Sequence, residues 1–321
     1  MSIVVTGAAG LIGSGVVRYL NDLGNAQLIL VDELDHPDKI RNLKGKNYKQ
    51  LVSIRSLFEW LKGREREIVA FIHLGACSDT LEQNESYLLE NNTKYTQKLA
   101  KYALKNGHRF IYASSAATYG DGSRGFSDDH DCLTELQPLN PYGRSKHLFD
   151  LWALQEGVLD QLVGLKYFNV FGPNEAHKGR MASMVYKMVP LVQKEGIIRL
   201  FKSSEPDKFP NGGQCRDFIY VKDVALMTCQ FLKETRGGIF NIGMGSPTPW
   251  NQLANAVFRA LNQPTQIEYI EMPQDLIQQY QNYTCAEMKK FREDKQVLLN
   301  YDIEKGVKDY VQNHLLQNQP W

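Results

Sequence analysis

Thr6-Gly7-Ala8-Ala9-Gly10-Leu11-Ile12-Gly13 is the most informative stretch of this 321-residue sequence. It lies between a short apolar run, typical of a buried strand, and an amphipathic stretch, typical of a helix. Gly7 permits a tight turn, Gly10 lets backbone approach a phosphate, and Gly13 lets the helix pack near the strand. The free N–H groups at the start of that helix would bind a pyrophosphate. The stretch predicts a dinucleotide-binding loop; the alternative is a glycine-rich turn that only packs tightly.

An acidic residue ends the next apolar run. Asp32 follows Gly13 by nineteen residues, where its carboxylate would meet the ribose hydroxyls of a dinucleotide. Asp32 and Glu33 would repel a 2′-phosphate, which favours NAD. The nearby cations could bind that phosphate instead and would favour NADP; they are Lys39, Arg41 and Arg55. The residues by themselves leave the choice between the two cofactors open.

Short apolar runs alternate with longer amphipathic stretches through the first two-thirds of the chain. The runs lack polar alternation, as strands buried on both faces do. The expected strands are Ile3–Thr6, Gln27–Asp32, Val69–Leu74, Arg109–Ser114 and Leu162–Tyr167. The expected helices are Leu11–Leu23, Leu51–Lys62, Tyr87–Asn106 and Tyr142–Gln155. This order predicts an α/β fold with a Rossmann-type, doubly wound parallel sheet.

Beyond Tyr167 the pattern loosens. Two stretches rich in Gly, Pro, Asn and Lys, Phe168–Arg180 and Lys202–Gly213, are too long for simple connections and are expected to be functional loops. The remaining expected elements are strands Cys215–Tyr220, Gly238–Ile242 and Gln266–Ile270 and helices Val221–Thr235, Trp250–Leu261 and Ile303–Leu316. We expect a Rossmann domain of residues 1–167 and about 214–245. A smaller, discontinuous C-terminal α/β substrate domain would take about 168–213 and 246–321.

The composition excludes several classes of protein. The net charge of +1 and the absence of a basic patch argue against nucleic-acid or membrane-surface binding. Five cysteines, an odd number without a C-x-x-C pair, argue against a disulfide framework or a metal site. No apolar run is long enough to span a membrane, and a strand begins too early for a signal peptide. We expect a cytoplasmic protein.

A tyrosine and a lysine stand four residues apart in Tyr142-Gly143-Arg144-Ser145-Lys146. On a helix they share one face, and the ammonium would lower the pKa of the phenol. Such a tyrosine can take the proton of an alcohol while hydride leaves for a nicotinamide. The pattern alone is common: Tyr301 and Lys305 repeat it and are interpreted as surface residues. Context separates the two pairs, because Tyr142 opens a helix one loop after the fourth expected strand.

Ser115 ends that strand, at the sheet edge where doubly wound folds bind ligands. Its hydroxyl is expected to hydrogen-bond the reacting oxygen. A lone serine at a strand end usually only caps a turn. Together with Tyr142 and Lys146 it forms a candidate catalytic triad.

These residues resemble the extended short-chain dehydrogenase/reductase family. Two further stretches look like the substrate-side motifs of its nucleotide-sugar epimerases and dehydratases: Tyr167-Phe168-Asn169-Val170-Phe171-Gly172-Pro173, and Arg216-Asp217-Phe218-Ile219-Tyr220-Val221. The resemblance covers residues 1 to about 245. A narrower similarity, to the ADP-glyceromanno-heptose 6-epimerase family, comes from His73-Leu74-Gly75-Ala76-Cys77-Ser78, Tyr112–Gly120 and His177-Lys178-Gly179.

The narrower resemblance implies a reaction and its participants. An ADP-heptose would be oxidised at C6 and reduced again from the other face, with Tyr142 and Lys178 as the two bases. NADP would be the cofactor, although NAD stays possible, and the protein would be a homo-oligomer, possibly a pentamer. The implied cofactor contacts are Leu11, Ile12, Asp32, Glu33, Lys39, Arg55, Leu74, Gly75, Ala76, Cys77, Ser78, Asn91, Tyr142, Lys146, Val170 and Lys178. The implied substrate contacts are Ser115, Asn169, Arg180, Lys187, Phe201, Lys202, Ser203, Ser204, Arg216 and Tyr280.

Several positions depart from the family pattern. Glu33 stands where the family commonly has a neutral residue, which weighs against NADP. Arg55 replaces a lysine, and Leu74 replaces an acid. The loop Glu205–Gln214 has the content of an insertion.

The residues bear differently on three rival functions. A sugar 4,6-dehydratase needs an Asp-Glu pair just after the active-site Ser or Thr, and Ala116-Ala117-Thr118 offers no carboxylate. A UDP-sugar 4-epimerase remains an alternative that would not need Lys178. A regulatory sensor that binds a dinucleotide is disfavoured, because such proteins lose the tyrosine or the lysine.

Overall fold

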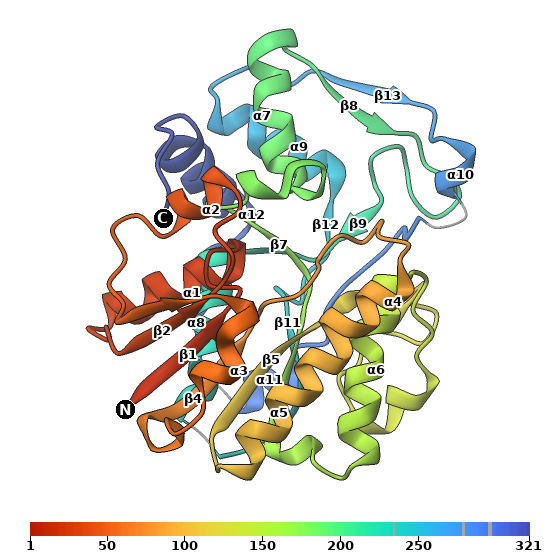
Figure 1. Cartoon of the computed structure of the whole chain (residues 1–321). Helices are drawn as coiled ribbons and strands as arrows, with labels where there is room; N and C mark the ends of the chain where they lie inside the picture. The colour runs from red at the N-terminus through yellow and green to blue at the C-terminus, as the bar shows by residue number, and fades with distance from the viewer. Residues whose placement is uncertain (234, 278–279, 295–296) are drawn as a thin grey trace.

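Seven parallel strands form the central sheet, in the order β11-β6-β5-β4-β1-β2-β3 (Figure 1). The computed structural model describes residues 1–233, 235–277, 280–294 and 297–321. The strands are β1 (Ser2–Thr6), β2 (Leu28–Val31), β3 (Gln50–Val52), β4 (Ile68–His73), β5 (Arg109–Ser115), β6 (Leu162–Tyr167) and β11 (Gly238–Ile242). Thr6 pairs with Val31 on one side and His73 on the other, so the carboxyl ends of neighbouring strands meet at one edge. The predicted doubly wound parallel sheet is confirmed.

Helices cover both faces of this sheet. Along one face α1 (Leu11–Asp22) packs against α8 (Val221–Gln230), and the other face carries α5 (Tyr95–Lys105) and α6 (Pro141–Gln155) (Figure 1). Shorter helices complete the layers: α2 (Pro37–Asn42), α3 (Leu57–Trp60), α4 (Glu85–Leu88) and α11 (Lys289–Asp294). Strands β1, β2, β6 and β11 are buried along their whole length, which explains their continuous apolar character.

A second region with its own apolar core lies above the carboxyl edge of the sheet (Figure 1). Its helices are α7 (Met184–Glu195), α9 (Trp250–Ala260), α10 (Gln274–Ile277) and α12 (Ile303–Asp309). Three two-stranded sheets accompany them: β7 (Asn169–Phe171) with β10 (Phe218–Tyr220), β9 (Cys215–Arg216) with β12 (Thr248–Pro249), and β8 (Ile198–Phe201) with β13 (Ile267–Ile270). The two-domain division stays a prediction; Ala286, Met288 and Phe291, assigned to the second domain, pack in the core of the central sheet.

Several expected elements differ in the structure. The expected helix 303–316 is α12 followed by a π-helical turn, Tyr310–Leu315, and the expected loop 168–180 contains β7. The expected helix 51–62 is strand β3, a 3-10 turn (Ile54–Ser56) and the four-residue α3. The expected strand 215–220 is two strands, β9 and β10, that pair in different small sheets. The expected helix 87–106 contains a π-helical turn, Leu89–Lys94, between α4 and α5. Strands this short are stabilised by pairing with a neighbour, so their own residues carry little signal.

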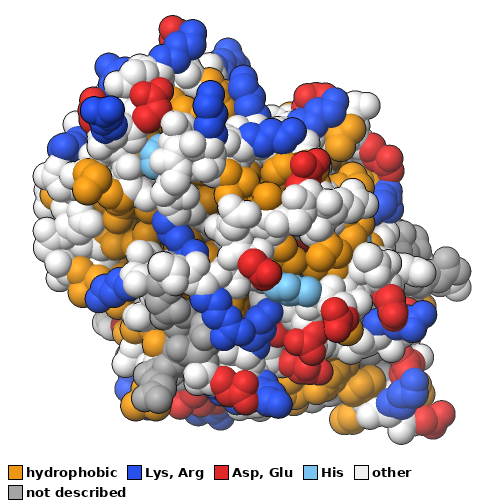
Figure 2. Space-filling view, turned by 90° about the horizontal axis from the view of Figure 1, so that it is seen from below, with side chains coloured by type: hydrophobic (Ala, Val, Ile, Leu, Met, Phe, Trp, Pro, Cys, Tyr) orange, Lys and Arg blue, Asp and Glu red, His pale blue; other side chains and the backbone are white. Residues whose placement is uncertain are grey.

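The face at the amino ends of the strands shows Lys and Arg side chains interspersed with Asp and Glu (Figure 2). In the part of the chain that the structure describes, no helix combines the length and the apolar character needed to cross a membrane.

Candidate active site

The glycine loop brings two strand ends into contact. Gly7 has a φ of 64°, and a Cβ there would lie 2.6 Å from the backbone nitrogen of Gly75, at the end of β4. A Cβ on Gly13 would lie 2.0 Å from the carbonyl oxygen of Gly7. Side chains at these positions would separate the loop from α1 and from the β4 loop. Helix α1 starts at Leu11, with Gly10 as its N-cap, so its free N–H groups face this loop.

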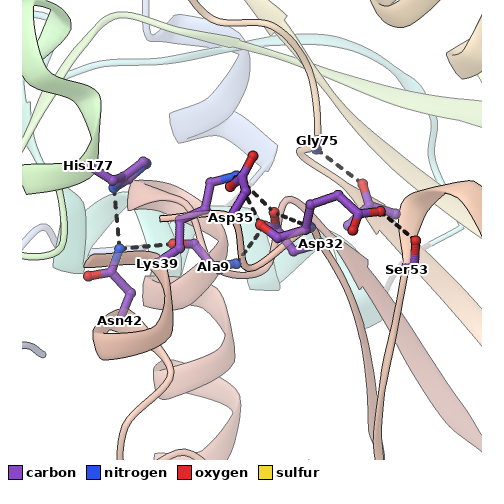
Figure 3. A network of polar contacts seen from close by, with 10 residues as sticks. Ala9, Asp32, Asp35, Lys39, Asn42, Ser53, Gly75 and His177 are labelled. Atoms are coloured by element: carbon purple, nitrogen blue, oxygen red, sulfur yellow. Dashed lines mark hydrogen bonds and ion pairs between the residues drawn. The ribbon is translucent and has the colours of Figure 1, made fainter. Parts of the chain in front are cut away.

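Asp32 is buried at the end of β2, and its carboxylate holds the glycine loop. It accepts hydrogen bonds from the N–H groups of Ala9 and Glu33, each at 2.8 Å (Figure 3). Lys39 Nζ lies 3.3 Å from the same carboxylate. The predicted ribose ligand therefore also fixes the loop that would bind the pyrophosphate.

Charges of both signs surround Asp32. Lys39 Nζ donates to Asp35 at 2.9 Å and to the carbonyl of Glu33 at 3.1 Å. Burial opposes the charged form of Lys39, but the bonds to Asp35 and Asp32 outweigh it and raise the pKa of this ammonium. Glu33 accepts from the hydroxyl of Ser53 at 2.5 Å, and the side chain of Arg55 is exposed beside that serine. Lys39 therefore lies against Asp32, and Arg55 lies beside the serine that binds Glu33. Arg41, the third predicted cation, donates instead to the carbonyl of Asn318.

The loop Leu74–Ser78 is organised by His73, for which no role was predicted, and by Asn92, which sequence reasoning missed. His73 lies 2.6 Å from the hydroxyl of Thr6 and 3.0 Å from that of Thr96, and Thr6 accepts from the N–H of Gly75 at 3.1 Å. Burial, with a smaller effect of the nearby charge of Lys146, lowers the pKa of His73 to about 3, so the ring is neutral.

Asn92 bonds both backbone groups of Cys77, accepting at 2.9 Å and donating at 3.0 Å, and donates to Ser145 on α6. Its neighbour Asn91, the predicted contact, is exposed and donates to the carbonyl of Tyr87. The buried amide of Asn92 therefore joins the β4 loop to α6, the helix that carries Tyr142.

Tyr142, Lys146 and Ser115 come together where α6 begins beside the end of β5. Asn140 caps the helix by accepting from the N–H of Gly143 at 2.7 Å. Lys146 Nζ donates to the carbonyl of Ala113 at 2.9 Å, and the hydroxyl of Tyr142 is hydrogen-bonded to Ser115. The predicted triad is thus assembled by one helix and one strand.

The pKa values of this triad differ from the expectation. Burial raises the pKa of Tyr142, and only the hydrogen bond to Ser115 opposes it. Burial lowers the pKa of Lys146 to about 8, against the attraction of Asp150 and Cys77. The expected lowering of the Tyr142 pKa by Lys146 is therefore wrong for this arrangement, because the ammonium is directed at the carbonyl of Ala113.

Lys178 lies in a 3-10 turn, Ala176–Met181, in which Gly179 has a φ of 50°. Its side chain is half-buried, and burial lowers its pKa; Glu175 acts in the opposite direction and Lys187 adds to the lowering. Glu175 is completely buried and accepts from the N–H and the hydroxyl of Ser183 at 2.6 and 2.7 Å. Arg180 pairs with Asp79 at 2.7 Å, which places this turn beside the β4 loop.

Aromatic rings surround Arg216 on the substrate side. Its guanidinium lies 4.9 Å from the ring centroid of Tyr280 and 5.9 Å from that of Trp250, which sequence reasoning missed. Phe201 meets Tyr280 edge to face, with centroids 6.5 Å apart. Burial lowers the pKa of Arg216. The structure therefore brings three of the predicted substrate residues together.

The other predicted substrate residues are more scattered. Lys202 pairs with Glu271 at 2.5 Å, and Lys187 Nζ donates to the carbonyl of Arg180 at 2.6 Å. Ser203, Ser204 and Asn169 are partly or fully exposed, on the loop after β8 and on β7. Val170, a predicted cofactor contact, is partly exposed on β7. No group of three or more His, Cys, Asp or Glu residues, among those that the structure describes, is placed to hold a metal ion.

Comparison with known proteins identifies the family. The model of the NAD dependent epimerase/dehydratase family matches residues 3–243, which include the glycine loop and the triad. The chain belongs to this family. Three features of the site fit the nicotinamide dinucleotide on which NAD dependent epimerases rely. They are the glycine cradle, which a Cβ would fill, the start of α1, and Asp32.

Relatives within the NAD dependent epimerase/dehydratase family match over nearly their whole length. The ADP-L-glycero-D-manno-heptose-6-epimerase of Nitratidesulfovibrio vulgaris strain DP4 is 44% identical, with 99% of each chain covered. That of Fusobacterium nucleatum is 42% identical, again with 99% of each chain covered. The crystal structure of the Helicobacter pylori enzyme of this name has a TM-score of 0.80 at 25% identity, covering 97% of this chain and 95% of that one.

Proposed function

We propose that this chain is an isomerase that inverts C6 of the heptose in ADP-glycero-manno-heptose. The relatives at 39–44% identity are named ADP-L-glycero-D-manno-heptose-6-epimerase, and Tyr142 and Lys178 are the proposed bases of the reaction. The observation that carries the proposal is the placement of Tyr142 and Lys178. Asn92 joins Cys77 to Ser145, which donates to the carbonyl of Tyr142. Asp79 pairs with Arg180 in the turn that holds Lys178, so the segments that carry both proposed bases border the loop after β4.

The residues divide the chemistry between two proton transfers. The bound nicotinamide supplies the chemistry of taking hydride from C6 and returning it to the opposite face. Tyr142 takes the hydroxyl proton of C6 as the ketone forms, and Ser115 hydrogen-bonds the same oxygen. Lys178 donates a proton to that oxygen when the ketone is reduced on the other side. Burial suits Lys178 to this role because its lowered pKa makes the ammonium a better acid.

Arg216 is the proposed ligand of the ADP pyrophosphate, because a guanidinium binds phosphate oxygens in a bidentate manner. The rings of Phe201 and Tyr280 beside it offer a surface for adenine. Asn169, Arg180, Lys187 and the stretch 201–204 would complete the substrate site.

NADP is the proposed cofactor, and Lys39 and Arg55 support it as ligands of a 2′-phosphate. Glu33 opposes it, so a Glu33→Ala variant should retain NADP and lose NAD. The nucleotide released on denaturation can be identified by chromatography. We further propose a cytoplasmic homo-oligomer; its five cysteines are all free thiols, as is usual in a reducing compartment.

The test is incubation of the purified protein with ADP-D-glycero-D-manno-heptose, followed by chromatographic separation of the two epimers. Wild type should convert the substrate, and Tyr142→Phe and Lys178→Met should each lose about 10²- to 10⁴-fold in kcat. Lys305→Met, in the second Tyr-x-x-x-Lys pattern, is the matched control, because this lysine is 68% exposed on α12 and should be dispensable. Absence of conversion by a wild type that retains its cofactor would refute the heptose assignment.

A further inference from the structure

Asn42, the last residue of α2, joins two loops of the site. It is 3% exposed, and its amide donates to the carbonyl of Ala9 at 2.8 Å and to that of Asn174 at 2.9 Å. The same amide lies 3.4 Å from Nδ1 of His177 (Figure 3). Ala9 belongs to the glycine loop, whereas Asn174 and His177 belong to the segment that carries Lys178.

Asn174 anchors the same segment to α1. Its φ of 75° is left-handed, which few residues other than Gly and Asn adopt. Its amide donates to the hydroxyl of Ser14 and to the carbonyl of Trp321, each at 3.0 Å, and its oxygen accepts from the N–H of Trp321. Ser14 in turn donates to the carbonyl of Gly10 at 2.6 Å.

Both backbone polar groups of Ala9 are therefore hydrogen-bonded. Its N–H donates to Asp32, the proposed ribose ligand, and its carbonyl accepts from Asn42. The pair Arg180–Asp79 also tethers the Lys178 turn, but the arginine is 68% exposed and such pairs are weak. The buried amides are the stronger connection, because an unmet hydrogen bond is costly in a buried site.

We propose that Asn42 is a positioning residue for Lys178, which it holds by tying the Lys178 turn to the dinucleotide loop. The role rests on the proposed function, because it assumes that Lys178 is the second base. Asn42 touches none of the reacting atoms and acts only through the position of this turn. Loss of its amide should free the turn while the glycine loop, still held by Asp32, keeps its nucleotide.

Asn42→Asp tests this with little change of shape, because a carboxylate facing two carbonyl oxygens cannot replace both donated bonds. Asn21→Asp is the matched control: the Asn21 amide also donates to two carbonyls, those of Asn25 and Asn47, away from Lys178. The readouts are tryptic cleavage after Lys178 and Arg180 with NADP present, bound nucleotide, and kcat and KM for ADP-heptose.

For Asn42→Asp we expect cleavage at both sites to accelerate at least tenfold and kcat to fall at least tenfold. KM should stay within about threefold and bound nucleotide within about twofold. In the double variant Asn42→Asp with Lys178→Met, kcat should be little lower than in Lys178→Met alone, because both substitutions act through the Lys178 ammonium. The control should match wild type in every readout.

Unchanged cleavage of Asn42→Asp would overturn the proposal. Loss of bound nucleotide without faster cleavage would overturn it too, because Asn42 would then support only the glycine loop and not the Lys178 turn. Should Asn42→Asp not fold, Asn42→Ala serves instead, because it removes the amide without placing a charge opposite the two carbonyl oxygens. Cleavage is measured without substrate, so it remains decisive if wild type fails to convert ADP-heptose. That failure would refute the proposed function alone.

Discussion

Lys178 lies between two charges of opposite sign. Burial lowers its pKa, Glu175 raises it, and Lys187 lowers it further. Glu175 cannot easily turn away, because it is fully buried and bonded twice to Ser183. The protonation of the proposed second base is therefore adjusted by its neighbours as well as by burial.

Changing each neighbour should move the pH dependence of kcat/KM in opposite directions. Glu175→Gln removes a negative charge, so the pKa of Lys178 falls further and the limb that depends on it moves to lower pH. Lys187→Gln removes a positive charge, so the same limb moves to higher pH. Exposed Lys194, on the same helix as Lys187, is the control and should move nothing. Shifts of equal sign in both variants would contradict this account.

Sequence patterns predicted the proposed catalytic side chains better than the side chains that hold them in position. Tyr142, Lys146 and Ser115 follow from a spacing and a strand end, and the structure brings them together. Asn42 and Asn92 were missed because a side-chain amide bonding backbone in a distant loop leaves no periodic pattern. Their partners are 33 and 15 residues away, and only the fold brings those partners near.

Helix α6 carries a buried carboxylate one turn beyond Lys146. Asp150 is completely buried and accepts from Tyr112 at 2.9 Å and from Ser114 at 2.6 Å, both on β5. Lys166 of β6, also fully buried, lies 3.4 Å away. One carboxylate thus joins the helix that carries Tyr142 to two strands of the sheet.

Asp150→Asn should lower the free energy of unfolding by about 3–5 kcal/mol, because it leaves the charge of Lys166 buried without its partner. Urea denaturation measures this loss. The double change Asp150→Asn with Lys166→Met should be less destabilised than Asp150→Asn alone. Glu90→Gln, in an exposed pair with Lys94 on the neighbouring helix, should cost under about 1 kcal/mol. Equal losses of unfolding free energy in Asp150→Asn and Glu90→Gln would show that the buried pair contributes no more than the exposed one.

Long, strongly patterned elements were predicted closely. The expected helix 142–155 is α6, and the expected strand 162–167 is β6. The failures are short elements such as β3, three residues that read as the start of a helix because Leu51 and Val52 precede a helical pattern. Pairing with β2 stabilises that strand, and pairing is a property of the sheet rather than of the segment.

Across the whole molecule, several histidines are buried in the neutral form. Burial lowers the pKa of His73 to about 3 and that of His177 to about 4, and it lowers those of His130, His147 and His314 as well. The unfolded chain, with histidine pKa values near 6.5, binds these protons first. Stability from these groups is present above about pH 6.5 and is lost as the pH falls toward 4 and then 3.

His73→Gln should flatten this dependence. Between pH 7 and pH 5 the wild type should lose about 2 kcal/mol of unfolding free energy through His73 alone. The variant is expected to be less stable at pH 7, but its unfolding free energy should fall by about 2 kcal/mol less than that of the wild type between pH 7 and pH 5. Urea denaturation at the two pH values measures this difference. His36→Gln, at an exposed position, is the control. An unchanged slope in His73→Gln would mean that the ring is not neutral in the folded protein.

The place of β11 has a consequence for biogenesis. This strand pairs with β6 at the edge of the sheet, yet the chain makes the small strands β7 to β10 and two helices between them. On a ribosome adding roughly 5–20 residues per second, the backbone groups on the β11 side of β6 stay unpaired for several seconds. Unpaired strand edges recruit other chains. A polypeptide that stops before Gly238 should therefore aggregate, and chaperones would have most to shield in that interval of synthesis.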